Sequence, residues 1–210
     1  MNLNQLHDAI LNGKLEEGLA STTAALEEGV DPQVIINDYM VKAMEEIGAR
    51  FEAGTAFVPN LLMSARAMKG VLNLLKPRLA SQPVATSGTV VIGTVKGDLH
   101  DIGKNLVASM LEGCGFEVIN LGVDVSSEQF VAAARKYHAD IVCMSALLTT
   151  TMNYMREVTA ALHASDLVPQ PRIMVGGAPL TESFAQEIGA DGYSSNANGA
   201  VILARRLVNA

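Results

Sequence analysis

An aspartate and a histidine two residues apart carry the clearest chemistry in this sequence. Asp98 and His100 lie in the stretch 96–105, which follows a short run of β-branched residues. An imidazole binds a metal through one ring nitrogen, and a carboxylate on the other nitrogen orients the ring and strengthens it as a donor. Gly97 and Gly103 would let the backbone turn tightly here. The pattern is typical of a metal-ligating histidine, but an Asp98 that caps the next helix beside an ordinary loop histidine is at least as good an interpretation.

Two later loops also follow runs of β-branched residues. Residues 145–151 read Ser-Ala-Leu-Leu-Thr-Thr-Thr, and these hydroxyls can cap the helix that comes next. Residues 176–179 read Gly-Gly-Ala-Pro, which leaves the backbone bare for something large to pass. Together with the histidine loop, they indicate a long groove at one edge of a sheet.

The elements that must position these loops are short strands alternating with helices. Strands are predicted at residues 89–95, 117–121, 141–145, 172–176 and 192–194, with helices beginning near residues 103, 126, 150, 180 and 196. This alternation predicts a five-stranded parallel sheet covered on both faces. The predicted fold is α/β, a flavodoxin-like, Rossmann-type doubly wound domain, in which ligands bind beyond the carboxyl ends of the strands.

The first part of the chain has a different period. Over residues 1–82 the apolar side chains recur every three or four positions, as they do in helices. Asp31 and Pro32 supply a helix cap and a first-turn proline. We predict an N-terminal four-helix bundle, a linker at residues 83–88 and a doubly wound domain at residues 89–210.

Composition excludes several classes of function. The net charge is −7 and the basic residues form no cluster, so no nucleic-acid partner is expected. We expect a cytoplasmic protein without a membrane partner, because no apolar run reaches the roughly 18 residues of a membrane span and the N-terminus lacks the basic-then-apolar layout of a signal peptide. No phosphate-binding glycine motif follows the first predicted strand, which argues against a dinucleotide or nucleoside-triphosphate site.

Three motifs together resemble a known family, the cobalamin-binding domains of methionine synthase and of methyltransferase corrinoid proteins. They are Asp98-x-His100-x-x-Gly103, Ser145-x-Leu147 and Gly176-Gly177. The longer string 97–105 is more similar to the methyl-transferring branch than to the mutase branch, and residues 122–125 also resemble the family. Residues 50–54 and 57–60 resemble the helical cap over the methyl face, so the resemblance covers nearly the whole chain.

The resemblance implies roles for the matching residues. His100 would be the lower axial ligand of cobalt, Asp98 would hydrogen-bond to it, and Thr151 would complete the relay in place of a serine. The residues implied to contact the corrinoid or its nucleotide tail are Asp98, His100, Asp101, Ile102, Gly103, Ser145, Leu147, Thr149, Gly176 and Gly177. In the cap, Phe51 would rest over the corrin ring, and Val58 stands where methionine synthase has a leucine.

The function implied is that of a methyl shuttle in one-carbon metabolism. The cofactor would be cobalamin or a related corrinoid, with methylcobalamin as the intermediate. A substrate-specific methyltransferase would supply the methyl group, a second methyltransferase would pass it to tetrahydrofolate or a thiol, and a reductive activase is a further expected partner. Neither domain has the roughly 250 residues of a (β/α)8 barrel, so the chain is not expected to turn over alone.

Three alternatives stay open. The chain could be the cobalamin-binding subunit of a radical mutase, a cobalamin-dependent sensor, or a flavodoxin-like domain without a cofactor. The cap resemblance argues against the mutase, and the sensor reading lacks a basic DNA-reading helix.

Overall fold

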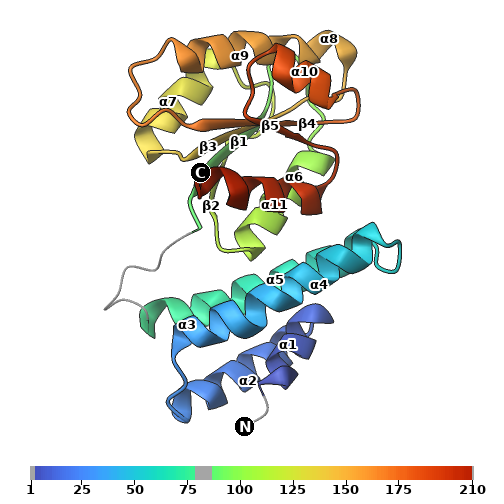
Figure 1. Cartoon of the computed structure of the whole chain (residues 1–210), viewed down its shortest axis with the longest axis vertical. Coiled ribbons are helices and arrows are strands. Elements are labelled where there is room, and N and C mark those ends of the chain that lie inside the picture. The colour runs from blue at the N-terminus through green and yellow to red at the C-terminus, as the bar shows by residue number, and fades with distance from the viewer. Residues whose placement is uncertain (1–2, 79–86, 210) are drawn as a thin grey trace. The chain divides into compact units, whose positions relative to one another are not determined.

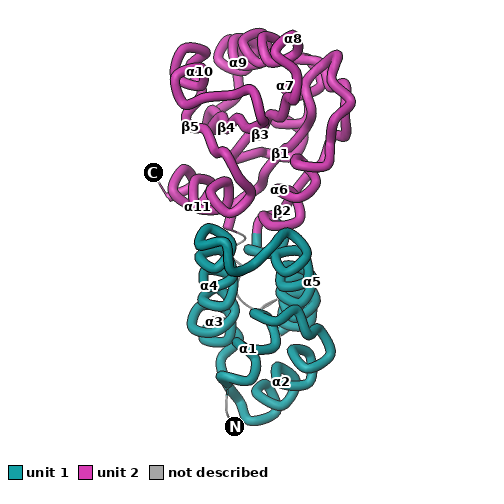
Figure 2. Tube along the Cα trace, turned by 90° about the vertical axis from the view of Figure 1, so that its right-hand side faces the viewer, with its two compact units in different colours: residues 1–85, 112–115 teal, residues 86–111, 116–210 magenta. Residues whose placement is uncertain are grey.

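The chain forms two compact units (Figures 1 and 2). The computed structural model describes residues 3–78 and 87–209. The first unit contains helices α1 to α5 and residues 112–115, and the second contains a sheet with the rest of α6 and helices α7 to α11. Residues 83–86 of the predicted linker lie outside the described ranges. Within those ranges, no helix is long and apolar enough to cross a membrane.

The N-terminal unit is entirely helical. Its elements are α1 (Asn4–Leu11), α2 (Leu15–Glu27), α3 (Pro32–Val34), a π-helical segment (Ile35–Met40), α4 (Val41–Glu52), α5 (Val58–Leu75) and a 3-10 turn (Lys76–Arg78). The Asp31 side chain accepts a hydrogen bond from the N–H of Gln33, and Pro32 occupies the first helical position, so the predicted cap is confirmed.

The π-helical segment joins α3 to α4 and departs from the predicted periodicity. A period of three or four positions would place Ile36 and Met40 on one face of an α-helix, but in this segment Ile35 and Met40 have no exposed surface and Ile36 is half-buried. Five positions separate Ile35 from Met40, which is the spacing of π-helical hydrogen bonds. The wider turn therefore brings both side chains into the core.

The C-terminal unit is built on five parallel strands in the order β2-β1-β3-β4-β5. The strands are β1 (Thr89–Thr94), β2 (Glu117–Asn120), β3 (Ile141–Ser145), β4 (Arg172–Gly176) and β5 (Gly192–Ser194). This order is that of flavodoxin-like sheets, so the predicted fold is confirmed. Beyond the end of β1, Val95 forms an isolated bridge to Val125, and its N–H donates to the carbonyl of Ser145 at 3.0 Å.

Helices cover both faces of this sheet (Figure 1). They are α6 (Ile102–Gly113), α7 (Ser127–Tyr137), α8 (Thr149–Met152), α9 (Tyr154–His163), α10 (Glu182–Glu187) and α11 (Ala197–Val208). On the face of α7, α9 and α10, Phe130, Val158 and Phe184 pack against Val142 and Val175 of the central strands. Burial of this apolar surface supplies the main free energy that holds the sheet.

The strand register aligns the ends of the strands that precede the predicted loops. Thr94 pairs with Ser145, Ser145 pairs with Gly176, and Gly176 pairs with Ser194. The chain therefore leaves β1, β3 and β4 side by side at the carboxyl edge of the sheet, where ligands of doubly wound folds bind.

Candidate functional site

The loop after β1 is tied back to its own strand. The N–H of Asp98 donates to the carbonyl of Val95 at 3.1 Å, and the Thr94 hydroxyl donates to the carbonyl of His100 at 3.0 Å. Gly97 turns the chain with a φ of +83°, a conformation that glycine adopts without strain. The short loop thus has a defined path to His100.

The Asp98 carboxylate is fully buried and joins two loops. One oxygen accepts from the backbone N–H of His100 at 3.0 Å and lies 2.8 Å from Nδ1 of the same residue. The other oxygen accepts from the N–H of Leu147 at 2.8 Å and from the Thr151 hydroxyl at 2.7 Å, with Leu148 N–H at 3.4 Å. The structure therefore brings together the three residues of the predicted relay.

This environment keeps Asp98 ionised. Burial alone would raise the pKa of the carboxyl, but hydrogen bonds from Thr151, Leu147 and His100 outweigh it and hold the pKa far below its ordinary range. An ionised carboxylate only accepts hydrogen bonds, so Nδ1 of His100 carries the proton that lies between them. In the neutral ring the lone pair is then on Nε2, which is the nitrogen left for a metal.

Both capping interpretations from the sequence are wrong. Helix α6 begins at Ile102, while the oxygens of Asp98 receive donors from its own loop and from the loop after β3. Helix α8 has Leu148 at its N-cap, without a side-chain hydrogen bond there. Because Thr151 is buried and donates to Asp98, its hydroxyl serves the relay.

Large apolar side chains are exposed around His100. Leu99 is 71% exposed and Ile102 is 88% exposed in the histidine loop, and Leu147 and Leu148 are each 42% exposed in the loop after β3. The His100 side chain itself is 52% exposed. Exposed apolar side chains beside one ligating nitrogen are suited to a large, mostly apolar ligand.

Gly176, at the end of β4, and Gly177, directly after it, lie close to neighbouring backbone. Gly177 has a φ of +141°, and a Cβ atom there would lie 1.9 Å from the carbonyl oxygen of Ala146. A Cβ at Gly176 would lie 3.2 Å from the carbonyl oxygen of Ser194. A residue with a Cβ would therefore not fit at Gly177, and the loops after β3 and β4 can lie in close contact here. Ser145, at the end of β3, is half-buried.

The other predicted contact residues are placed as follows. Asp101 is half-buried and accepts from the side-chain amide of Asn105 at 2.8 Å. Gly103 and Thr149 are exposed, in the first turns of α6 and α8. Phe51 is half-buried in α4, and Val58, at the start of α5, is 39% exposed. The contacts of these residues with a corrinoid stay predictions.

Sequence reasoning missed a buried lysine next to the histidine loop. Lys104 is 3% exposed, and its Nζ donates to Asn105 Oδ1 at 2.6 Å and to Asn120 Oδ1 at 2.7 Å. Asn120 Oδ1 also accepts from the N–H of Gly122 at 3.0 Å. Burial lowers the pKa of Lys104 although the charge of Asp101 opposes it. The lysine therefore links the first turn of α6 to the end of β2. In the sequence, its position within the family-like string 97–105 was the only indication of a role.

Replacing Lys104 by methionine is expected to lower the free energy of unfolding by about 1–3 kcal/mol, because the carbonyl oxygens of Asn105 and Asn120 lose a buried donor. Urea denaturation of the chain without cofactor measures this. Lys42→Met is the matched control: Lys42 is 62% exposed and lies 3.7 Å from Asp38, so its loss should stay within about 0.5 kcal/mol. Equal losses in the two variants would show that the network contributes nothing.

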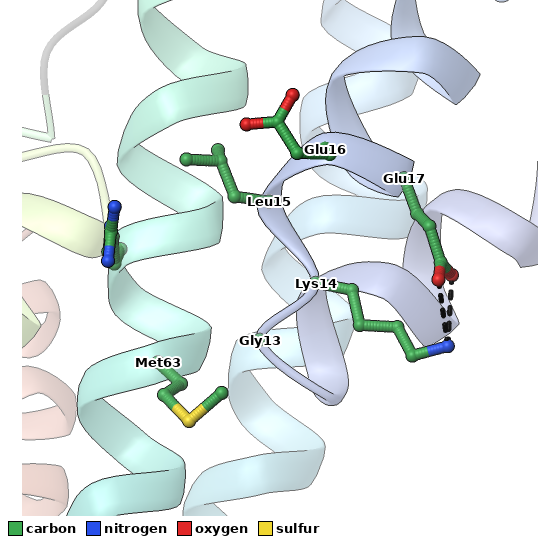
Figure 3. Close-up of a pocket in the computed structure, with 7 residues that line it drawn as sticks. Gly13, Lys14, Leu15, Glu16, Glu17 and Met63 are labelled. Atoms are coloured by element: carbon green, nitrogen blue, oxygen red, sulfur yellow. Dashed lines mark hydrogen bonds and ion pairs between the residues drawn. The ribbon is translucent and has the colours of Figure 1, made fainter.

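A separate cavity lies in the helical unit (Figure 3). Its volume is about 310 Å³, and Lys14 forms an ion pair with Glu17 at 2.9 Å on its wall. Gly13, Met63 and Arg66 also line it, and none of the predicted site residues does. Among residues 3–78 and 87–209, no group of three or more His, Cys, Asp or Glu side chains that could hold a bare metal ion is present.

Comparison with known proteins decides the family. Two models described as a B12 binding domain match the chain, one over residues 88–202 and one over residues 3–76. A corrinoid protein of Desulfitobacterium hafniense is 38% identical over 209 residues, which cover 98% of this chain and 97% of the relative. The trimethylamine corrinoid protein 2 of Methanosarcina acetivorans is 42% identical over 196 residues, 92% of this chain and 90% of the relative.

This chain belongs to the B12-binding corrinoid proteins. Two solved structures agree with the assignment. A cobalamin-binding protein from D. hafniense has a TM-score of 0.83 at 30% identity, covering 99% of this corrinoid protein and 98% of that chain. A chain of the methanol:cobalamin methyltransferase complex from Methanosarcina barkeri has a TM-score of 0.85 at 31% identity. The match covers 99% of this corrinoid protein and 79% of that chain. The predicted resemblance to corrinoid proteins of methyltransferase systems and the predicted corrinoid cofactor are thereby confirmed.

The geometry of this corrinoid protein fits that cofactor. His100 would hold the cobalt of such a group through Nε2, because its other ring nitrogen, Nδ1, contacts Asp98. The exposed Leu99, Ile102 and Leu147 offer apolar contact to a ring.

Proposed function

We propose that this corrinoid protein carries methyl groups between methyltransferases, with His100 as the lower axial ligand of its cofactor. The observation that carries the proposal is the 2.8 Å contact between the buried Asp98 carboxylate and Nδ1 of a half-exposed His100, at the carboxyl edge of the sheet. A bound corrinoid supplies a cobalt centre that accepts and releases a methyl group.

The residues of the relay have distinct tasks in this proposal. Asp98 fixes the orientation and tautomer of the imidazole, so that Nε2 faces outward as a donor. Thr151 and the N–H of Leu147 hold the second oxygen of Asp98 and keep it from rotating. A metal bound at Nε2 would strengthen the hydrogen bond from the Nδ1 proton to Asp98. Binding of the metal would therefore be coupled to how closely Asp98 shares this proton.

Ser145, Gly176 and Gly177 are proposed to line the groove for the nucleotide tail of the corrinoid. They lie at the carboxyl edge of β3 and β4, where register places Ser145 beside Gly176. Phe51 and Val58 are proposed, from the family resemblance, to contact the corrin ring. These assignments follow the family resemblance and the positions of the residues on their elements.

The partners are proposed from the relatives. Curated relatives are named for dimethylamine and trimethylamine, and one solved relative is a complex with a methanol methyltransferase. A substrate-specific methyltransferase is thus the first proposed partner. A second methyltransferase that serves tetrahydrofolate or a thiol and a reductive activase complete the cycle. These relatives favour methyl transfer over the mutase and sensor alternatives.

The test is reconstitution with hydroxocobalamin, comparing the wild type with His100→Ala by absorption spectroscopy. We expect stoichiometric binding, a spectrum that changes when His100 is removed, and methylation of the bound corrinoid by methyl iodide after titanium(III) reduction. His138→Ala is the control, since His138 lies at the carboxyl end of α7. Identical spectra for the wild type and His100→Ala would refute the ligand, and failure to bind any corrinoid would refute the function.

A further inference from the structure

Asp124 has an uncommon backbone conformation in the loop between β2 and α7. Its φ is +56°, and His138 is the only other non-glycine residue with positive φ in the described ranges. His138 is the C-cap of α7, where left-handed residues are common. Asp124 instead lies two residues before Ser126, the N-cap of α7. Outside glycine, aspartate and asparagine tolerate this conformation best.

Two hydrogen bonds join Asp124 to the histidine loop. Its carboxylate accepts from the N–H of Gly97 at 2.7 Å, and its own N–H donates to the carbonyl of Asp98 at 3.1 Å. One exposed residue therefore holds two consecutive residues of the loop, one through its side chain and one through its backbone.

The hydrogen bonds to Asp124 connect the histidine loop to a segment other than β1. Bonds to Val95 and Thr94 tie it to its own strand, whereas Asp124 ties it to the neighbouring connection. Gly97 lies directly before Asp98, and the Asp98 carboxylate orients His100. A rotation of the Gly97 peptide would shift that carboxylate and, with it, the direction of the imidazole.

We infer that Asp124 is a positioning residue for the axial histidine. It holds the Gly97–Asp98 backbone so that the Asp98 carboxylate keeps the His100 imidazole in one orientation. The inference rests on the proposed role of His100. Groups that orient a metal-ligating residue commonly change metal affinity by 10–100-fold when they are removed, so the loss of the Asp124 carboxylate should weaken corrinoid binding about 10-fold.

Two substitutions separate the carboxylate from the backbone conformation. Asp124→Gly adopts positive φ without strain and removes only the acceptor for Gly97. Asp124→Asn keeps an oxygen acceptor and tolerates the same φ, so it should restore wild-type behaviour. Thermal melting of each chain without cofactor verifies that both variants are folded.

The experiment titrates each variant with hydroxocobalamin, records its absorption spectrum, and follows exchange of the Gly97 amide by NMR without cofactor. For Asp124→Gly we expect about 10-fold weaker binding, a spectrum displaced toward that of His100→Ala, and faster Gly97 exchange, with Asp124→Asn like the wild type. Wild-type binding and spectrum in Asp124→Gly would overturn the inference, as would an unprotected Gly97 amide in the wild type, which requires no variant. If the wild type and His100→Ala gave the same spectrum, the proposed ligand would fail first.

Discussion

Replacing Asp98 by asparagine is expected to lower the free energy of unfolding by about 3 kcal/mol and to abolish the effect of His100 on the corrinoid spectrum. The carboxylate is fully buried and accepts from His100, Leu147 and Thr151. Asparagine has one acceptor oxygen, and its amide group would face a donor on the other side. Breaking a buried charged hydrogen-bond network costs this amount or more.

The dependence on pH gives this prediction a second measurement. The folded pKa of Asp98 lies below its unfolded value of about 4. The ionised form therefore stabilises the fold above pH 4, and this contribution is lost as the pH falls through the lower, folded pKa. Urea denaturation without cofactor should show a gap between wild type and Asp98→Asn that is full near pH 7 and shrinks below pH 4.

A surface carboxylate supplies the control. Asp166 is 79% exposed and pairs with Arg135, so solvent screens the pair and Asp166→Asn should leave the unfolding free energy close to that of the wild type at pH 7. A loss in Asp98→Asn no larger than in Asp166→Asn would mean that the buried contacts do not stabilise the fold. A gap that stayed constant down to pH 3 would contradict the depressed pKa.

The fold could be predicted because its signals are local. The alternation of short strands with helical stretches placed β3, β4 and β5 at their observed bounds, and β1 and β2 ended only one residue earlier than predicted. The π-helical segment could not be predicted, because the burial of Ile35 together with Met40 depends on packing against the rest of the helical unit. Periodicity alone does not distinguish a spacing of four from one of five.

The candidate site, too, could be predicted only in part from the sequence. Asp98 and His100 are two residues apart, so their contact could be inferred from spacing. Thr151 lies 53 positions from Asp98, and only the family resemblance placed it in the relay. Lys104 was not predicted, because its partner Asn120 comes from another strand and a lysine in a polar stretch is usually exposed. Asp124 was not predicted, because its partner Gly97 lies 27 positions away in another loop. Their roles depend on tertiary contacts.

Replacing Gly177 by alanine is expected to cost about 4 kcal/mol of unfolding free energy, among the largest effects of a single added methyl group. The new Cβ would lie 1.9 Å from the carbonyl oxygen of Ala146, an atom of the backbone that no rotamer change can move. A φ of +141° is, in addition, nearly restricted to glycine. The variant must therefore separate the loops after β3 and β4 or fail to fold.

Gly189→Ala isolates the contribution of backbone strain from that of the close contact. Gly189 lies in the same unit with a φ of +77°, and a Cβ there would meet its nearest atom, Cε1 of His163, at an ordinary 3.5 Å. Left-handed strain alone costs about 1–2 kcal/mol, so urea denaturation should rank Gly177→Ala well below Gly189→Ala in stability. Equal losses would mean that the contact with Ala146 is relieved without cost. Leu147 follows Ala146 in the chain, and its N–H donates to Asp98. If Gly177→Ala folds, the displaced Ala146 should therefore also weaken this hydrogen bond, and the corrinoid spectrum of the variant should move toward that of Asp98→Asn.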